Sequence, residues 1–193
     1  MPAERRWDQR EYRIVESASH NNNARTVIIE TTTPGTSVPP HYHSRFSETF
    51  ELINGSVSVY AGPADTSELA FKSTLTPLEP GKPMTVPLGW YHQFVVGNET
   101  STFKCTLEPG DIGFENMLKV LDGLKRDGGL DKLEEDDVFL AVLMDLTDAH
   151  PLWKVGDILI NVRKERSEAI EQMKEDLLKK YDTPEALARL MAD

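Results

Sequence analysis

Short runs of β-prone residues, each closed by glycine or proline, dominate the first half of this 193-residue chain. The runs that we expect to be strands are 12–15, 26–33, 49–53, 56–60, 69–75, 84–86, 91–96 and 101–107. Asn54-Gly55 separates two of them, and Asn-Gly between β-prone runs is the strongest short signal for a type I′ hairpin. About seven short strands at this spacing within 26–107 are typical of an antiparallel sandwich or barrel.

The hydrophobic period changes to that of helices after Glu108-Pro109-Gly110. Apolar residues at helical spacing predict a first helix and are Phe114, Met117, Leu118, Leu121 and Leu124. Asp136-Asp137 precedes a continuous apolar run, so we expect a buried helix over 138–146, although the length of the run also allows a strand. Two more helices are expected, one over about 164–181 and one beginning at Thr183-Pro184.

These patterns divide the chain into two parts. We expect a β-barrel with an N-terminal arm over residues 1–109 and a helical extension packed on the barrel over residues 110–193. Because the run from Val138 to Met144 is continuously apolar, we also expect the helix over 138–146 to pack on the mouth of the barrel as a lid.

Composition and charge narrow the classes of partner. The chain is 39% hydrophobic and 27% charged, as in ordinary globular proteins, and its formal net charge is -11. Nucleic acids and anionic membranes both reward clustered lysine and arginine, so we expect neither as a partner. Cys105 is the one cysteine, and the first residues lack an apolar signal region. A reducing, cytoplasmic location is therefore the expectation.

One segment carries candidate metal ligands. His41 and His43 are two residues apart after Pro39-Pro40, which holds the chain extended, so both imidazoles point to a common face. In the strand that follows, Glu48 shares a face with Phe50 and Leu52. Two imidazoles and a carboxylate form most of a metal site. The alternative is that both histidines are ordinary loop residues.

A fourth candidate ligand lies further along the chain. His92 follows the tight turn Pro87–Trp90 at the start of an expected strand, and Phe94 and Val96 share its face. The alternative is a half-exposed histidine without a role. Tyr91 points away from that face, and a lone strand cysteine such as Cys105 is usually buried and inert.

The two segments together resemble the cupin superfamily. Its first motif, G-x5-H-x-H-x3,4-E-x6-G, is matched at every fixed position by Gly35, His41, His43, Glu48 and Gly55. Its second motif, G-x5-P-x-G-x2-H-x3-N, is matched by Gly81, Pro87, Gly89 and His92. Val96 stands where the family has its final asparagine, which puts the local turn in doubt more than the metal.

The resemblance covers about residues 26–107 and implies a fold and a cofactor. The fold is mainly β, a small antiparallel jelly-roll barrel, followed here by the α-helical extension. The cofactor is one divalent metal ion held by His41, His43, Glu48 and His92. This ligand set suits Fe, Mn, Ni, Co, Cu or Zn and does not choose among them. Cupins commonly pair their barrels, so a homodimer is also implied.

A mononuclear metal-dependent enzyme is the first function that these residues indicate. The metal would act as a Lewis acid or bind dioxygen, and Glu48 is the candidate general base. The reaction class is an oxidoreductase (a dioxygenase) or a non-redox isomerase, cyclase or decarboxylase. The substrate pocket predicted from strand parity consists of Phe50, Leu52, Trp90 and Phe94, which suits a small hydrophobic or aromatic molecule. These side chains could instead be barrel core.

Two alternatives come from other classes. One is a non-catalytic, metal-containing cupin that binds a small molecule as a sensor or carrier. The other is a structural or storage barrel, which four intact ligands disfavour.

Overall fold

The computed structural model describes residues 7–133 and 135–192. The strands are β1 (Arg10–Glu16), β2 (Thr26–Thr32), β3 (His41–His43), β4 (Ser47–Asn54), β5 (Val57–Gly62), β6 (Thr76–Pro77), β7 (Met84–Val86), β8 (Tyr91–Val96), β9 (Ser101–Glu108) and β10 (Ala149–Pro151). The helices are α1 (Glu68–Phe71), α2 (Ile112–Arg126), α3 (Asp137–Leu146), α4 (Trp153–Tyr181) and α5 (Pro184–Met191), with short 3₁₀ turns η1 (Trp7–Gln9), η2 (Ala18–His20) and η3 (Leu130–Lys132). Residues 1–6 of the expected N-terminal arm lie outside the described residues.

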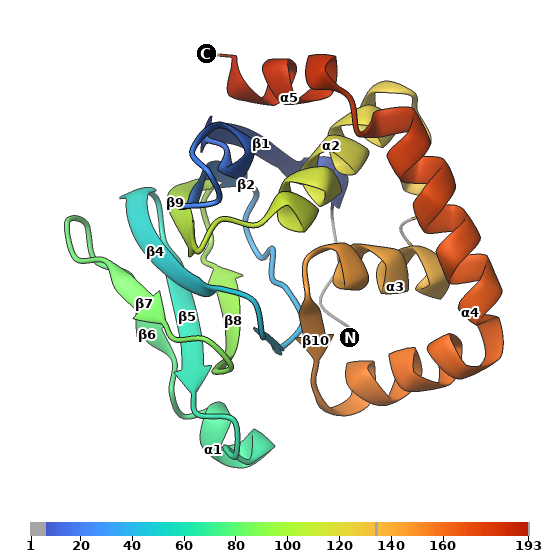
Figure 1. Ribbon diagram of the computed structural model, residues 1–193. Coiled ribbons are helices and arrows are strands. Elements are labelled where there is room, and N and C mark those ends of the chain that lie inside the picture. The colour runs from blue at the N-terminus through green and yellow to red at the C-terminus, as the bar shows by residue number, and fades with distance from the viewer. Residues whose placement is uncertain (1–6, 134, 193) are drawn as a thin grey trace.

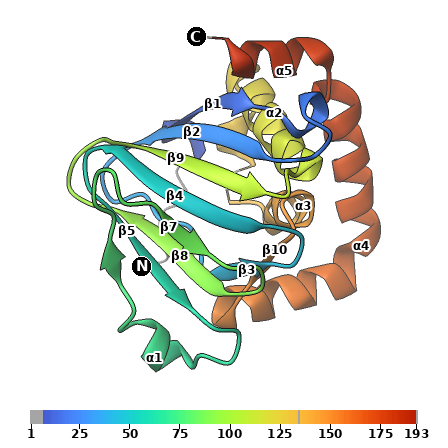
Figure 2. The ribbon, with the colours of Figure 1, turned by 60° about the vertical axis from the view of Figure 1, so that its left-hand side comes forward.

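Two five-stranded antiparallel sheets face each other (Figure 2). One sheet has the strand order β1-β2-β9-β4-β7, and the other has the order β10-β3-β8-β5-β6. The expected edge strand at 12–15 is β1, which pairs with β2 alone. The described chain is therefore a jelly-roll β-barrel followed by helices, as the sequence predicts.

The turn at Asn54-Gly55 differs from the prediction. Gly55 has a positive φ of 87°, but β4 pairs with β7 and β9 while β5 pairs with β6 and β8. The expected hairpin is wrong because this turn carries the chain from one sheet to the other. A Cβ atom at Gly55 would lie 2.7 Å from Ser101 Cα, so both the φ angle and the close approach require glycine.

The strand expected over 69–75 is also wrong. Ser67 caps the short helix α1 there, with its Oγ accepting a hydrogen bond from the Ala70 amide. Leu69 is 83% exposed, whereas Phe71 is buried against the ring of Tyr60. Phe71 is the side chain that anchors this segment, and one turn of helix is enough to bury it. The segment therefore lacks the alternation of buried and exposed residues that a strand would show.

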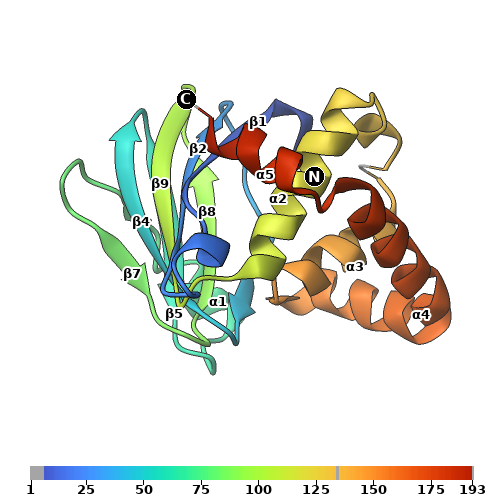
Figure 3. The same cartoon turned by 45° about the horizontal axis from the view of Figure 1, so that its top comes forward.

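The long helices lie on one side of the barrel (Figures 1 and 3). Helix α2 is tied to the barrel by its buried Glu115 carboxylate. This carboxylate accepts hydrogen bonds from Ser17 Oγ at 2.7 Å, the Ala18 amide at 2.6 Å and Thr26 Oγ1 at 2.7 Å. Three short bonds to one buried charge fix the helix on the sheet strongly.

The expected buried helix over 138–146 is confirmed as α3. Asp136 caps it by accepting a bond from the Val138 amide, and nearly every side chain of the helix is buried. Helix α4 bends around the outside of α3, with a kink at Arg166 (φ −130°, ψ 30°) (Figure 1). The helix expected over 164–181 is the C-terminal part of α4, and α5 begins with the Thr183 cap as predicted.

Strand β10 was not predicted from the sequence. It follows α3 and pairs with β3, the strand that carries His41 and His43. The segment after residue 109 thus contributes to the barrel, and the division of the chain into two domains stays a prediction. Among residues 7–133 and 135–192, no helix combines the length and apolar character needed to cross a bilayer.

Candidate metal centre

Four side chains from three strands converge at one end of the barrel interior. His41 and His43 come from β3, Glu48 from β4 and His92 from β8, and their ligand atoms lie within 4.8 Å of one another. His41 and His92 are cross-strand partners, whereas Glu48 reaches in from the opposite sheet. His43, Glu48 and His92 are buried. The structure therefore brings all four predicted ligands together.

A backbone carbonyl fixes the tautomer of each imidazole. The Nδ1 atoms lie 2.7 Å from Pro39 O for His41, 2.9 Å from Thr147 O for His43 and 3.0 Å from Trp90 O for His92. A carbonyl only accepts, so each Nδ1 carries the proton and donates it. Each Nε2 then presents a lone pair, which is the form that binds a metal.

The Nε2 atoms face other acceptors. His41 Nε2 lies 3.1 Å from His43 Nε2, and His92 Nε2 lies 2.8 Å from Glu48 Oε2. His92 Nε2 is nevertheless buried with no hydrogen-bond partner in the described part of the chain. Lone pairs that face lone pairs in a buried site repel one another, and a shared cation removes the repulsion. The donor set therefore fits a bound divalent ion.

Burial and the neighbouring side chains together set the charge states of His41, His43 and Glu48. Burial lowers the pKa of His41 well below the usual range, and the nearby imidazoles of His92 and His43 lower it further. Burial likewise lowers the pKa of His43 to about 4. For Glu48, burial alone would raise the pKa, but the neighbouring His43 and His92 outweigh it and bring the value to about 2. At neutral pH His41 and His43 are neutral and Glu48 is ionised, as ligation requires.

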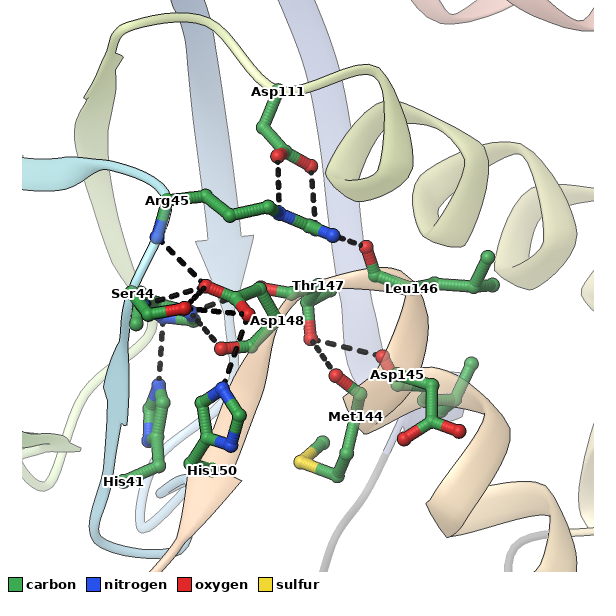
Figure 4. Close-up of polar contacts among 12 residues, drawn as sticks. His41, Ser44, Arg45, Asp111, Met144, Asp145, Leu146, Thr147, Asp148 and His150 are labelled. Carbon is green, nitrogen blue, oxygen red and sulfur yellow. Dashed lines mark hydrogen bonds and ion pairs between the residues drawn. The ribbon is translucent and has the colours of Figure 1, made fainter. Parts of the chain in front are cut away.

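The turn that follows helix α3 holds His43 in place. The turn after α3 supplies the Thr147 carbonyl that accepts from His43, and Asp148 in that turn has a positive φ of 52°. The Asp148 carboxylate accepts bonds from the Ser44 amide at 2.6 Å and the Arg45 amide at 2.8 Å (Figure 4). The turn after α3 and the end of β3 are therefore joined by hydrogen bonds, and these bonds stabilise the strained φ angle of Asp148.

Arg45 strengthens the same lock. Its guanidinium lies 2.8 Å from the Asp111 carboxylate and donates to Leu146 O at 2.7 Å (Figure 4). His150 adds a contact at 3.0 Å to Asp148. Although partial burial would raise the pKa of Asp148, hydrogen bonds from Ser44 and His150 lower it. The carboxylate is therefore ionised when it binds the strand.

A cavity of about 80 Å³ extends from the four ligands into the molecule. A water needs about 10–15 Å³ by the same measure, so the cavity accommodates a small organic molecule. Its apolar walls come from the barrel and from both neighbouring helices and include Phe50, Phe94, Phe114, Met117, Leu143 and Met144. Helix α3 therefore forms part of the cavity wall, and whether it opens as a lid stays a prediction.

Comparison with known proteins gives a partial match. No protein-family model matches the chain. A germin-like protein, subfamily 3 member 2, of Arabidopsis thaliana is 33% identical over 91 residues, which are 47% of this chain and 38% of that protein. The chain thus spans well under half the length of this relative, whose activity does not transfer as a finding.

Several solved structures are similar to the barrel at low scores. KdgF from Halomonas sp. has a TM-score of 0.44 at 16% identity and covers 54% of this chain and 82% of its own. The polyketide cyclase RemF from Streptomyces resistomycificus has a TM-score of 0.42 at 20% identity, covering 52% and 65%. A predicted oxalate decarboxylase from Thermotoga maritima has a TM-score of 0.44 at 18% identity, covering 52% and 80%. Scores this low carry no argument about activity.

The residues of the two motifs are placed as the resemblance to cupins implies. The histidines and the glutamate converge, and Gly35, Gly55, Gly81 and Gly89 all have positive φ at turns. The chain is thus similar to cupins in its jelly-roll barrel and in the placing of these residues. The missing asparagine is replaced without loss of the turn, since the Val96 amide donates to Thr36 O at 2.9 Å.

The barrel places only part of the predicted pocket in the cavity. Phe50 and Phe94 line it. Leu52 and Trp90 do not, which corrects the prediction. Leu52 lies further along β4, half-buried opposite Phe103, and Trp90 lies in the turn before β8 with 38% of its surface exposed. Strand parity gives the face of a residue but not its depth along the barrel.

The sequence prediction missed the opposite end of the cavity. Trp7, Arg10 and Tyr12 line it from the N-terminal segment, and Glu30 lines it from β2. Glu30 was the available signal, because it is a charged residue within an otherwise β-branched run. Nothing local indicated Arg10, since its partner is 20 residues away in sequence.

Proposed function

We propose that this protein is a mononuclear metal-dependent cupin enzyme acting on a small, largely apolar organic molecule. The observation that carries the proposal is the convergence of three Nε2 lone pairs and one ionised carboxylate at the end of a largely apolar cavity. His41, His43, Glu48 and His92 would hold one divalent ion. Fe, Mn, Ni, Co, Cu and Zn all suit this donor set.

A bound divalent ion would supply Lewis-acid polarisation of a substrate oxygen or a binding position for dioxygen. The chain itself contributes orientation and exclusion of water, because Phe50, Phe94 and Leu143 enclose the space beside the ligands. Glu48 is ionised and, when it swings off the metal, would take a proton from a substrate hydroxyl or acidic C–H. A dioxygenase and a non-redox isomerase, cyclase or decarboxylase both fit this arrangement.

The apolar lining of the cavity also suits a second function. Helices α2 and α3 contribute Phe114, Met117 and Leu143 to the wall beside the ligands. A site lined in this way could hold a small molecule without turning it over, as a sensor or carrier does.

The homodimer and the cytoplasmic location stay predictions, and light scattering of the purified protein tests the first.

The test of the proposal begins with metal-free protein reconstituted separately with each of the six metals. Each form is incubated with a library of small ketones, phenols and enols, and turnover is followed by mass spectrometry and an oxygen electrode. The His92→Ala variant is the control. Turnover that depends on the metal and disappears in the variant supports an enzyme. Stoichiometric metal and small-molecule binding without turnover supports the sensor or carrier, and no metal binding contradicts both.

A further inference from the structure

A buried ion pair lies in the cavity away from the metal ligands. Arg10 Nε is 2.6 Å from Glu30 Oε1, and Arg10 Nη2 is 3.0 Å from Glu30 Oε2. Both residues line the cavity, and each is 6% exposed. Two parallel bonds of this kind fix the plane of the guanidinium.

Aromatic rings hold the same guanidinium from its faces. Arg10 Cζ lies 4.8 Å from the ring centre of Trp7 and 5.3 Å from those of Tyr12 and Phe94. The side chain is thus held at its edge by the carboxylate and approached by three rings, and only 6% of it is exposed. Arg10 is therefore a rigid group that does not reorganise when a ligand binds.

Two donors at this end of the cavity remain unsatisfied. Arg10 Nη1 and Tyr12 Oη are both buried, and neither has a hydrogen-bond partner among residues 7–133 and 135–192. Burial raises the pKa of Tyr12, so its phenol stays protonated and donates. A third orphan atom, Thr32 Oγ1, does not line the cavity. Buried donors without acceptors are costly, and a bound ligand is one way to satisfy them.

The charge of this end selects the acceptor. Glu30 already neutralises Arg10, so a carboxylate entering here would meet the Glu30 charge. A neutral oxygen, in a carbonyl or hydroxyl group, accepts from both donors without that repulsion.

A row of aromatic rings joins the two ends. Phe50 lies 6.5 Å from His92 by ring centres and 6.2 Å from Phe103. Phe103 lies 5.2 Å from Phe94, the ring that contacts Arg10. The wall between the metal ligands and the unsatisfied donors is therefore apolar.

We propose that Arg10 and Tyr12 form a second subsite that binds a neutral carbonyl or hydroxyl oxygen of the substrate. The substrate class is a small molecule with an apolar body, an oxygen at the end remote from the metal and a metal-binding group at the other. The last feature rests on the proposed function, whereas the oxygen subsite stands without it.

The test uses metal-free protein and two probes of the same shape, cyclohexanone and methylenecyclohexane, which differ in a carbonyl oxygen against a CH₂ group. Binding is measured by NMR titration of wild type, Tyr12→Phe and Tyr60→Phe. Tyr60 is the matched control, because it stacks on Phe71 outside the cavity. The melting temperature of each variant is recorded as well.

We expect wild type to prefer cyclohexanone. Tyr12→Phe should weaken cyclohexanone binding about tenfold while changing methylenecyclohexane binding less than about twofold, since one hydrogen bond is lost. Its melting temperature should not fall, because the hydroxyl removed has no hydrogen-bond partner among the residues that the structure describes. Tyr60→Phe should change neither affinity.

Three results would overturn the subsite. These are no preference for the ketone, a preference that survives in Tyr12→Phe, or binding of neither probe. A lower melting temperature in Tyr12→Phe without a change in selectivity would assign the hydroxyl to a structural, water-bridged role. The binding test uses metal-free protein, so its outcome does not depend on the metal site. A failure of the protein to bind metal would overturn the proposed function but would not affect the test of the Arg10 and Tyr12 subsite.

Discussion

The two ends of the cavity differ in the kind of polar atom that they leave unpartnered. At the metal end, His92 Nε2 is buried, faces Glu48 and has no hydrogen-bond partner within the described chain, so the unsatisfied atom is an acceptor. At the other end, Arg10 Nη1 and Tyr12 Oη are donors that the described residues leave unsatisfied. The first end calls for a cation and the second for an oxygen atom.

The ends also differ in how they are held. Each imidazole is fixed from behind by a backbone carbonyl a few residues away or in the turn after α3. Arg10 is fixed by the Glu30 side chain from β2, by the rings of Trp7 and Tyr12 in its own segment and by the ring of Phe94 from β8. Both arrangements orient polar groups before a ligand arrives, which is what binding sites require.

The largest effect should come from breaking the donor end. Glu30→Leu leaves the Arg10 charge buried and unpaired, so we expect a loss of about 3–5 kcal/mol in the free energy of unfolding, measured by urea denaturation. The double variant Arg10→Met/Glu30→Leu should be close to wild type, since it removes both charges. Equal losses in the single and double variants would show that the pair is not coupled.

A substitution at the metal end of the cavity should lower the affinity for metal. Glu48→Gln removes the one negative ligand, and we expect the affinity for Co²⁺ to fall by more than about 100-fold in competition with a chelator. Glu51→Gln is the matched control, because Glu51 lies on the other face of β4 and pairs with Lys104 at 2.6 Å. A similar loss in both variants would point to net charge and not to ligation.

A substitution in the turn that supports His43 should have a smaller effect on metal affinity. Asp148→Asn weakens the bonds that hold the Thr147 carbonyl against His43, so metal affinity should fall about 10–100-fold. Asp145→Asn, which disturbs only the contact with Arg163 at 2.6 Å, is the control and should keep wild-type affinity. Unchanged affinity in Asp148→Asn would mean that the helical segment does not support the metal site.

Cys105, which lies beside Glu48, should have the smallest effect. Its Sγ is 3.6 Å from Glu48 Oε1, and burial, followed by the charges of Glu48 and Glu30, raises the pKa of the thiol well above its usual value. The Cys105→Ala variant should retain full metal content and lose only about 1 kcal/mol of stability. A drop in metal content by elemental analysis would instead make the sulfur part of the metal end.

The sequence was sufficient where the spacing is local. His41 and His43 share a face by strand parity, and Glu48 follows in the next strand, so spacing alone indicated these three candidate ligands. His92, which is 44 residues further along the chain, was added through the resemblance to the second cupin motif. The buried helix α3 could also be predicted from the sequence, because its apolar run is continuous.

Long-range pairing was beyond the sequence. Nothing local shows that Arg10 meets Glu30 or that β10 returns to β3. The turn at Gly55 was wrongly expected to form a hairpin for the same reason, because local turn chemistry does not say which sheet the next strand joins. Parity likewise placed Leu52 on the inner face but could not place it outside the cavity.

The most direct test of the metal end is a titration of metal-free protein with Co²⁺, followed by visible absorption. We predict one ion per chain, with ligand-field bands that are absent in the His92→Ala variant. The same titration of Glu51→Gln should match wild type. Absence of binding, or bands that persist unchanged in His92→Ala, would contradict the account of His41, His43, Glu48 and His92 as a metal centre.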